Sequence, residues 1–144
     1  MWLLKFRNLK EPGFIIVVED DADDRFLFQT AFEENGFKDS LLYLENGYEL
    51  IQYLKQLKPG NSGEKIPGFI LMDLNMPKLN GREVLREIKK DDTWNSVPVV
   101  IFSTTSNEAE RLRCMELGAA AYYTKPVTFG ALISTVAQIR NSFA

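Results

Sequence analysis

The chain has 144 residues and a net charge of -3, which fits one soluble domain and argues against a nucleic-acid-binding surface, because phosphate binding requires clustered Lys and Arg. The absence of histidine excludes Ser-His-Asp catalysis, Cys-His catalysis and histidine metal ligation. A single cysteine, Cys114, excludes an intramolecular disulfide and favours a reducing cytoplasm. No apolar run approaches the roughly 20 residues that a bilayer requires, so we expect no membrane segment.

Strand and helix patterns alternate from residue 13 onward, after an N-terminal extension of residues 1–12. Short apolar runs are typical of strands, and continuous ones of strands buried on both faces. They predict strands at 14–18, 41–44, 69–72, 97–102 and 121–124. Helical apolar spacing follows each of these runs. The expected helix caps and ends are Asn107 and Thr128 at helix starts, and Asn35-Gly36 and Gly118 at helix ends.

Five strands alternating with five helices predict an α/β fold over residues 13–144. The expected architecture is flavodoxin-like: a doubly wound parallel sheet of five strands in the order 2-1-3-4-5. In that order the first and third strands flank the point where the winding reverses. Ligands bind there, outside the carboxyl ends of the strands. The residues that follow strands 1, 3, 4 and 5 should therefore converge.

Polar residues with complementary chemistry occupy these strand ends: Glu19 and Asp20, then Asp73, Ser103 and Lys125. Clustered carboxylates repel one another unless a cation joins them, and Mg²⁺ prefers such oxygen ligands. A carboxylate can act as the nucleophile towards phosphorus and form an aspartyl phosphate. An ammonium and a hydroxyl can bind the phosphate oxygens. The expected site therefore has the parts for in-line phosphoryl transfer to a carboxylate.

Together these segments resemble the response regulator receiver domains of two-component signalling, over roughly residues 13–142. The residues that carry the resemblance are Val-Val-Glu-Asp at 17–20, Leu-Met-Asp-Leu-Asn-Met-Pro at 71–77, Gly81, Ser103-Thr104 and Lys125-Pro126. The loop before the third strand and the Gly-Arg-Glu-Val-Leu segment at 81–85 resemble the subgroup of single-domain regulators that includes phytochrome-linked ones.

The resemblance implies a role for each site residue. Asp73 would be the phosphoacceptor, with Lys125 and Ser103 binding the phosphoryl group. Glu19, Asp20 and Asp73 would hold Mg²⁺, with the backbone carbonyl of Asn75 as a further ligand. Ser103 and Tyr122 would form the switch. Tyr122 would turn into space vacated by Ser103 and change the surface of the last two helices and the last strand.

The function implied is a cytoplasmic, chemotaxis-regulator-like switch rather than an enzyme, one that catalyses only its own phosphorylation and slow dephosphorylation. A histidine kinase or histidine phosphotransfer protein would supply the phosphoryl group in a Mg²⁺-dependent reaction. Since no output domain fits after the last helix, the signal would pass by contact with a downstream protein or by phosphorelay. No nucleic-acid or membrane partner is expected, and homodimer formation is left open.

Several alternatives remain at the residue level. Asp21 competes with Asp20 as a metal ligand, and Tyr123 competes with Tyr122 as the switch aromatic. Asp23 and Asp24 are interpreted as a solvated helix start, where carboxylates favour the positive end of the helix dipole.

Two other functions are weighed. A Mg²⁺-dependent phosphatase of the haloacid-dehalogenase kind needs a second Asp two residues after the nucleophile, where this chain has Asn75. A pseudo-receiver would bind partners without ever taking phosphate, and the presence of Asp73 and Lys125 argues against it.

Overall fold

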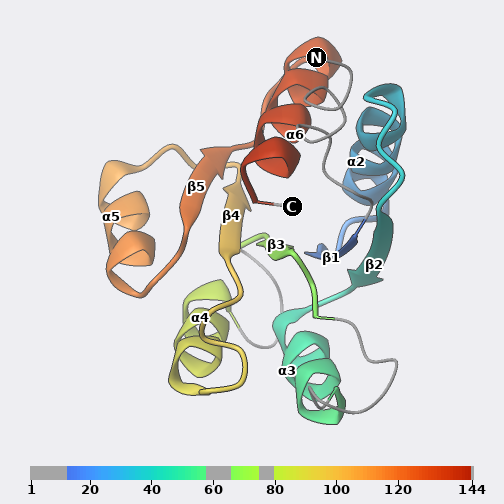
Figure 1. The fold of residues 1–144 in the computed structure, drawn as a ribbon. Coiled ribbons are helices and arrows are strands. Elements are labelled where there is room, and N and C mark those ends of the chain that lie inside the picture. Colours follow the sequence, from blue (N-terminus) through green and yellow to red (C-terminus); the bar gives the residue numbers. More distant parts are fainter. Residues whose placement is uncertain (1–12, 58–65, 75–79, 144) are drawn as a thin grey trace, which may run out of the picture.

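The computed structural model describes residues 13–57, 66–74 and 80–143, which form a parallel sheet with helices on both faces (Figure 1). The elements in chain order are β1 Phe14–Val18, α2 Ala22–Glu34, β2 Ser40–Leu44, α3 Gly47–Gln56, β3 Phe69–Met72, α4 Gly81–Lys90, β4 Val99–Ser103, α5 Glu108–Glu116, β5 Ala121–Thr124 and α6 Phe129–Phe143. The strand order is β2-β1-β3-β4-β5. The predicted architecture and strand order are confirmed.

Each face of the sheet packs into its own hydrophobic core. Ile15 and Val17 of β1 point into the core covered by α2 and α6, while Ile16 and Val18 point into the core covered by α3, α4 and α5 (Figure 1). Successive side chains of a strand point to opposite faces, so a strand covered on both sides must be apolar at every position. This double burial explains the uninterrupted apolar run that predicted β1.

The register of the strands brings their carboxyl ends level. Val18 pairs with Met72 across β1 and β3, and Ser103 pairs with Thr124 across β4 and β5. The pairing continues into the next residues, because the Asp73 amide donates to the Val18 carbonyl at 3.2 Å and the Lys125 amide donates to the Ser103 carbonyl at 2.7 Å. The residues that follow β1, β3 and β5 therefore begin at the same edge of the sheet.

The bounds of two strands differ from the prediction. β4 runs from Val99 to Ser103 rather than over 97–102. The Val97 amide donates to the Trp94 carbonyl in a turn, and Pro98 has no amide hydrogen and contributes only its carbonyl, which accepts from the Ile70 amide of β3 at 2.9 Å. At the other end, pairing with β5 draws Ser103 into the strand. β2 begins one residue early, at Ser40.

The predicted helix ends are confirmed. Asn107 accepts a hydrogen bond from the Glu110 amide at 3.0 Å, and Thr128 accepts one from the Ala131 amide at 3.2 Å. Gly36 and Gly118 take φ values of 77° and 105° after α2 and α5, a left-handed conformation that favours glycine. The expected extension 1–12 and most of the loop before β3 lie outside the described residues. No described helix is both long enough and apolar enough to cross a membrane.

Candidate functional site

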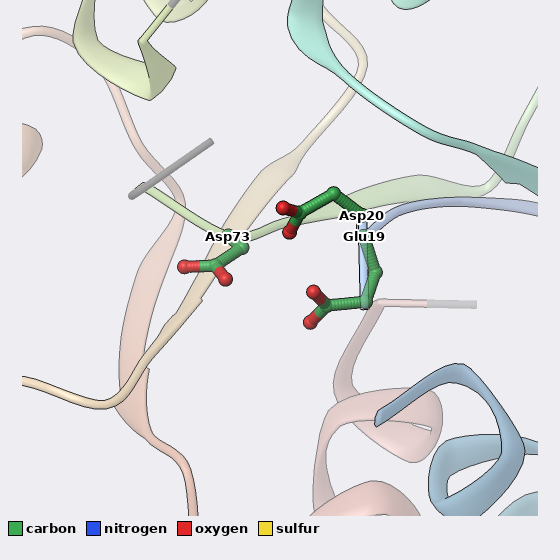
Figure 2. A group of neighbouring side chains, drawn as sticks. All are labelled: Glu19, Asp20 and Asp73. Carbon is green, nitrogen blue, oxygen red and sulfur yellow. The ribbon is translucent and has the colours of Figure 1, made fainter. Parts of the chain in front are cut away.

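Three carboxylates meet at the carboxyl ends of β1 and β3. Glu19 is buried, Asp73 is half-buried and Asp20 is exposed, and each offers an oxygen within 4.8 Å of the other two. In Figure 2 the side chains of Glu19 and Asp20 extend from the end of β1 towards the side where Asp73 lies. Glu19 and Asp20 follow β1, and Asp73 follows β3, which is the parallel neighbour of β1. The structure thus brings together the three residues that the sequence predicted as metal ligands.

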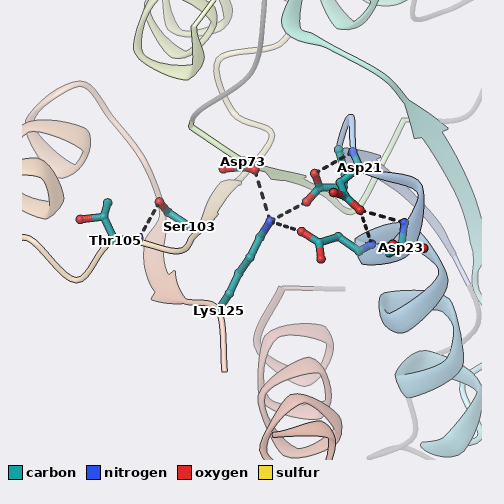
Figure 3. A network of polar contacts seen from close by, with 8 residues as sticks. Asp21, Asp23, Asp73, Ser103, Thr105 and Lys125 are labelled. Atoms are coloured by element: carbon teal, nitrogen blue, oxygen red, sulfur yellow. Dashed lines mark hydrogen bonds and ion pairs between the residues drawn. The ribbon is translucent and has the colours of Figure 1, made fainter. Parts of the chain in front are cut away.

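Lys125, which follows β5, reaches into this cluster. Its ammonium donates to Glu19 Oε1 at 2.6 Å, to Asp24 Oδ2 at 3.0 Å and to Asp73 Oδ2 at 3.2 Å (Figure 3). These contacts connect residues that are between 52 and 106 positions apart in the chain. The ammonium places a positive charge beside the oxygens of Asp73, where an incoming phosphate would also need one.

The local environment changes the ionisation of these groups. Burial raises the pKa of the Glu19 carboxyl above its ordinary value, although the hydrogen bond and the charge of Lys125 oppose the rise. Burial by itself lowers the pKa of Lys125, but the hydrogen bonds to Glu19 and Asp24 and the charge of Asp73 outweigh it. The net direction for the Lys125 pKa is upward, so the ammonium keeps its charge at neutral pH.

Asp21 performs a different task from its neighbour Asp20. Its Oδ1 accepts hydrogen bonds from the backbone amides of Asp23 at 2.8 Å and Asp24 at 3.0 Å, which makes it the N-cap of α2. The carboxylate cluster contains Asp20 and not Asp21. Of the two alternatives left open by the sequence, the geometry therefore favours Asp20 as the third acidic group.

Asp24 corrects a sequence interpretation. The sequence favours a solvated residue at a helix start, whereas in the structure Asp24 forms an ion pair with Lys125, and its side chain is 40% exposed. Asp23, in the same turn, is exposed as expected. The N-cap is the sequence signal that could have identified Asp24. If Asp21 is the N-cap, Asp24 is the third residue of the helix and lies on the same side of the helix as Asp21. Asp23 is rotated about 100° around the helix axis from Asp24.

The predicted switch residues lie on the adjacent strands β4 and β5, where Ser103 pairs with Thr124 and Tyr122 pairs with Ile101. Ser103 is fully buried, and its Oγ accepts a hydrogen bond from the Thr105 amide at 3.3 Å (Figure 3). The Tyr122 hydroxyl donates to the carbonyl of the same Thr105 at 2.8 Å. Burial raises the pKa of that hydroxyl, which stays protonated at neutral pH. Tyr123 packs instead into the core under α2 and α6, so the loop after β4 connects Ser103 to Tyr122 alone.

A cavity of about 260 Å³ opens beside the cluster. Its polar lining consists of Glu19, Asp24, Asp73, Thr104 and Lys125, and apolar side chains of β1, β3, β4, α2, α6 and the loop after β5 form the rest of its wall. Leu27 and Val127 stand at its rim and are 42% and 101% exposed. A group carried by a partner can therefore approach Asp73 from the side of α2 and the loop after β5.

The donor set fits a hard divalent cation. Glu19, Asp20 and Asp73 provide only carboxylate oxygens, which Mg²⁺ prefers, and the exposed Asp20 leaves one side open to the waters that Mg²⁺ retains. The further ligand implied by the resemblance, the Asn75 carbonyl, lies outside the described residues.

Comparison with known proteins gives a consistent picture. The family model for the response regulator receiver domain matches residues 15–137. The chain is 32% identical over 132 residues to the probable methanogenesis regulatory protein FilR2 of Methanothrix harundinacea, covering 92% of this chain and 84% of that protein. It is 33% identical over 130 residues to the response regulator Rcp1 of Synechocystis sp., covering 90% and 88%.

Two solved structures are similar over almost the whole chain. The crystal structure of the Mn²⁺-bound form of Rcp1 has a TM-score of 0.77 and 33% identity, covering 90% of this chain and 92% of that one. The crystal structure of the phosphorylated cyanobacterial phytochrome response regulator RcpA has a TM-score of 0.81 and 34% identity, covering 92% and 94%. One relative has thus been seen with a metal ion and another in a phosphorylated form.

Proposed function

The chain belongs to the response regulator receiver domain family, and we propose that it is a signalling switch in which Asp73 accepts a phosphoryl group. The observation that carries the proposal is the site itself: Asp73 lies within 4.8 Å of the Glu19 and Asp20 oxygens and 3.2 Å from the Lys125 ammonium. The family is one of signalling receivers rather than classical enzymes, so we do not retain the phosphatase alternative. The receiver unit is taken as residues 13–144.

The proposed donor is a phosphohistidine on a histidine kinase or a histidine phosphotransfer protein. An Asp73 carboxylate oxygen attacks phosphorus in line with the P–N bond, and an acyl phosphate forms as that bond breaks. The bonding electrons stay on the imidazole nitrogen, which leaves neutral or takes a proton from water. Lys125 binds a phosphoryl oxygen through a charge-assisted hydrogen bond, and the Ser103 hydroxyl binds another.

Mg²⁺ is the proposed cofactor, held by Glu19, Asp20 and Asp73, with Asn75 as a backbone ligand. When bound, it supplies positive charge that neutralises the phosphoryl oxygens and polarises phosphorus for attack. The hard oxygen donors of this chain and the Mn²⁺-bound structure of the relative Rcp1 support the assignment. The structure of the relative RcpA in a phosphorylated form likewise supports the proposal that this chain accepts a phosphoryl group.

The output is proposed to be protein contact or phosphorelay in the cytoplasm. Ser103 moves towards the phosphoryl group, and because Thr105 contacts both Ser103 and Tyr122, the loop after β4 follows. Packed interiors adopt discrete arrangements, so a small shift at the site changes the surface formed by α5, β5 and α6. A downstream partner, or a second copy of the chain, would bind that surface.

Acetyl phosphate, a small phosphodonor, tests the proposal without the cognate kinase. The purified protein is incubated with acetyl phosphate and Mg²⁺, and its intact mass is measured. We expect a gain of one phosphoryl group that disappears when EDTA removes the metal. Equal labelling with and without a divalent ion would contradict the proposed role of the carboxylate cluster.

A further inference from the structure

Lys125 is bound by more carboxylates than the proposed chemistry requires. Its ammonium donates to Glu19, Asp24 and Asp73 at 2.6, 3.0 and 3.2 Å. An ammonium group has three N–H donors and accepts nothing. All three donors are therefore engaged, and a phosphoryl group on Asp73 can bind Lys125 only if one of these hydrogen bonds opens.

The three carboxylates differ in the free-energy cost of losing the hydrogen bond from Lys125. Glu19 is 6% exposed, so opening its bond would leave a buried carboxylate oxygen, Oε1, without its hydrogen-bond donor. Asp73 carries the phosphoryl group, and its hydrogen bond passes to a phosphoryl oxygen once Lys125 moves outward to follow that group. Asp24 has a 40% exposed side chain, and water can replace its lost bond at little cost. Of the two bonds that hold Lys125 back from such a movement, the one to Asp24 therefore costs less to open.

Asp24 is well suited to act as a tether for Lys125. The Asp24 backbone amide donates to Asp21 Oδ1 at 3.0 Å, which fixes Asp24 in the first turn of α2. The Lys125 side chain, in contrast, extends from the residue that follows β5. The ion pair pulls the ammonium towards the α2 side of the cavity that Asp24 and Lys125 both line. Lys125 can move towards a phosphoryl group without any change in the backbone of α2.

We propose that Asp24 is a positioning residue that competes with the phosphoryl group for Lys125 and so destabilises the phosphorylated form relative to the resting form. A ligand shifts an equilibrium only by its differential affinity for the two states, and the Asp24–Lys125 contact exists in one of them. This inference rests on the proposed function. It predicts that removing the Asp24 carboxylate tightens the binding of a phosphoryl group or its analogue.

The chain offers a matched control in Asp23. Asp23 is exposed and sits in the same helical turn, so Asp23→Asn removes the same charge from nearly the same place without touching Lys125. Asp24→Glu keeps the negative charge and tests whether any carboxylate at this position restores the wild-type affinity. Lys125→Met removes the group through which Asp24 is proposed to act, so the effect of Asp24→Asn should vanish in that background.

The experiment is a titration with beryllofluoride, an analogue of the phosphoryl group, at saturating Mg²⁺, followed by amide NMR spectra that also report folding. We expect Asp24→Asn to lower the apparent dissociation constant about fivefold, as fits a partly exposed ion pair. Asp23→Asn should stay within about twofold of the wild type. Asp24→Glu should return towards the wild-type value.

Two results would overturn the inference and leave the proposed function standing. In the first, Asp24→Asn binds beryllofluoride no more tightly than Asp23→Asn. In the second, its effect persists with Lys125→Met, which would assign it to charge alone. A wild-type protein that binds no beryllofluoride with Mg²⁺ would instead remove the proposed function, and this inference with it.

Discussion

Asp20 and Asp21 are adjacent residues with different roles in this account, one facing the metal cluster and the other capping α2. Asp20→Ala should weaken Mg²⁺ binding at least about tenfold, because even groups outside the first coordination sphere contribute that much to metal affinity. Asp21→Ala should leave the affinity nearly unchanged but lower the free energy of unfolding by about 1 kcal/mol. Calorimetric Mg²⁺ titration and urea unfolding separate the two effects, and the reverse pattern would show that the metal site is assigned one residue too early.

How far single residues could be predicted depends on how their positions are fixed. Glu19, Asp73 and Lys125 follow apolar strands directly, so the end of each strand determined their place. Asp24 could not be placed in this way, since five acids lie between positions 19 and 24 and their pattern has no period. The role of Asp24 depends on the start of α2 at Ala22, which is set by a side-chain cap rather than by composition.

At the scale of elements, α5, β5 and α6 should respond to phosphorylation through the contacts of Ser103, Thr105 and Tyr122. Beryllofluoride with Mg²⁺ should change amide NMR shifts or hydrogen exchange over residues 106–130. Ser103→Ala should still accept phosphate but reduce those changes, because it removes the hydroxyl that follows the phosphoryl group. The exposed Ser106 gives a control, Ser106→Ala. Changes confined to the loops around Asp73 in the wild type would rule out this switch.

The central strands were predictable because a strand that is buried on both faces of the sheet appears in the sequence as an uninterrupted apolar run. The prediction was less accurate where local hydrogen bonding determines a strand end. Val97 is as apolar as Val99, yet only Val99 starts β4, because Val97 is taken into a turn and Pro98 lacks an amide hydrogen. Composition does not contain that information.

At the scale of the whole molecule, a buried ion pair joins the two ends of the described chain, at the edge of the sheet opposite the site. Asp39 accepts from Arg140 of α6 at 3.0 Å and from the Gly13 amide at 2.7 Å, and the Arg140 guanidinium lies 4.7 Å from the centre of the Phe37 ring. The partners are 101 residues apart, and no sequence pattern indicated the contact.

Breaking this pair should destabilise the fold without altering the site. Asp39→Ala leaves Arg140 buried and without its carboxylate, so we expect the free energy of unfolding to fall by about 3–5 kcal/mol. Combining it with Arg140→Met should restore part of the loss, since the double variant buries neither charge. Urea unfolding measures both. A loss below about 1 kcal/mol, the level of a surface ion pair, would contradict the structural role assigned to Asp39.

The central claim is that Asp73 alone takes the phosphoryl group. Peptide mapping by mass spectrometry after incubation with acetyl phosphate and Mg²⁺ tests it most directly, with Asp73→Asn as the variant that keeps the shape of the side chain and removes the nucleophile. We expect one phosphoryl group per wild-type chain, located on the peptide that contains Asp73, and none on Asp73→Asn. Labelling of Asp73→Asn at the wild-type level, or wild-type labelling mapped to another residue, would contradict it.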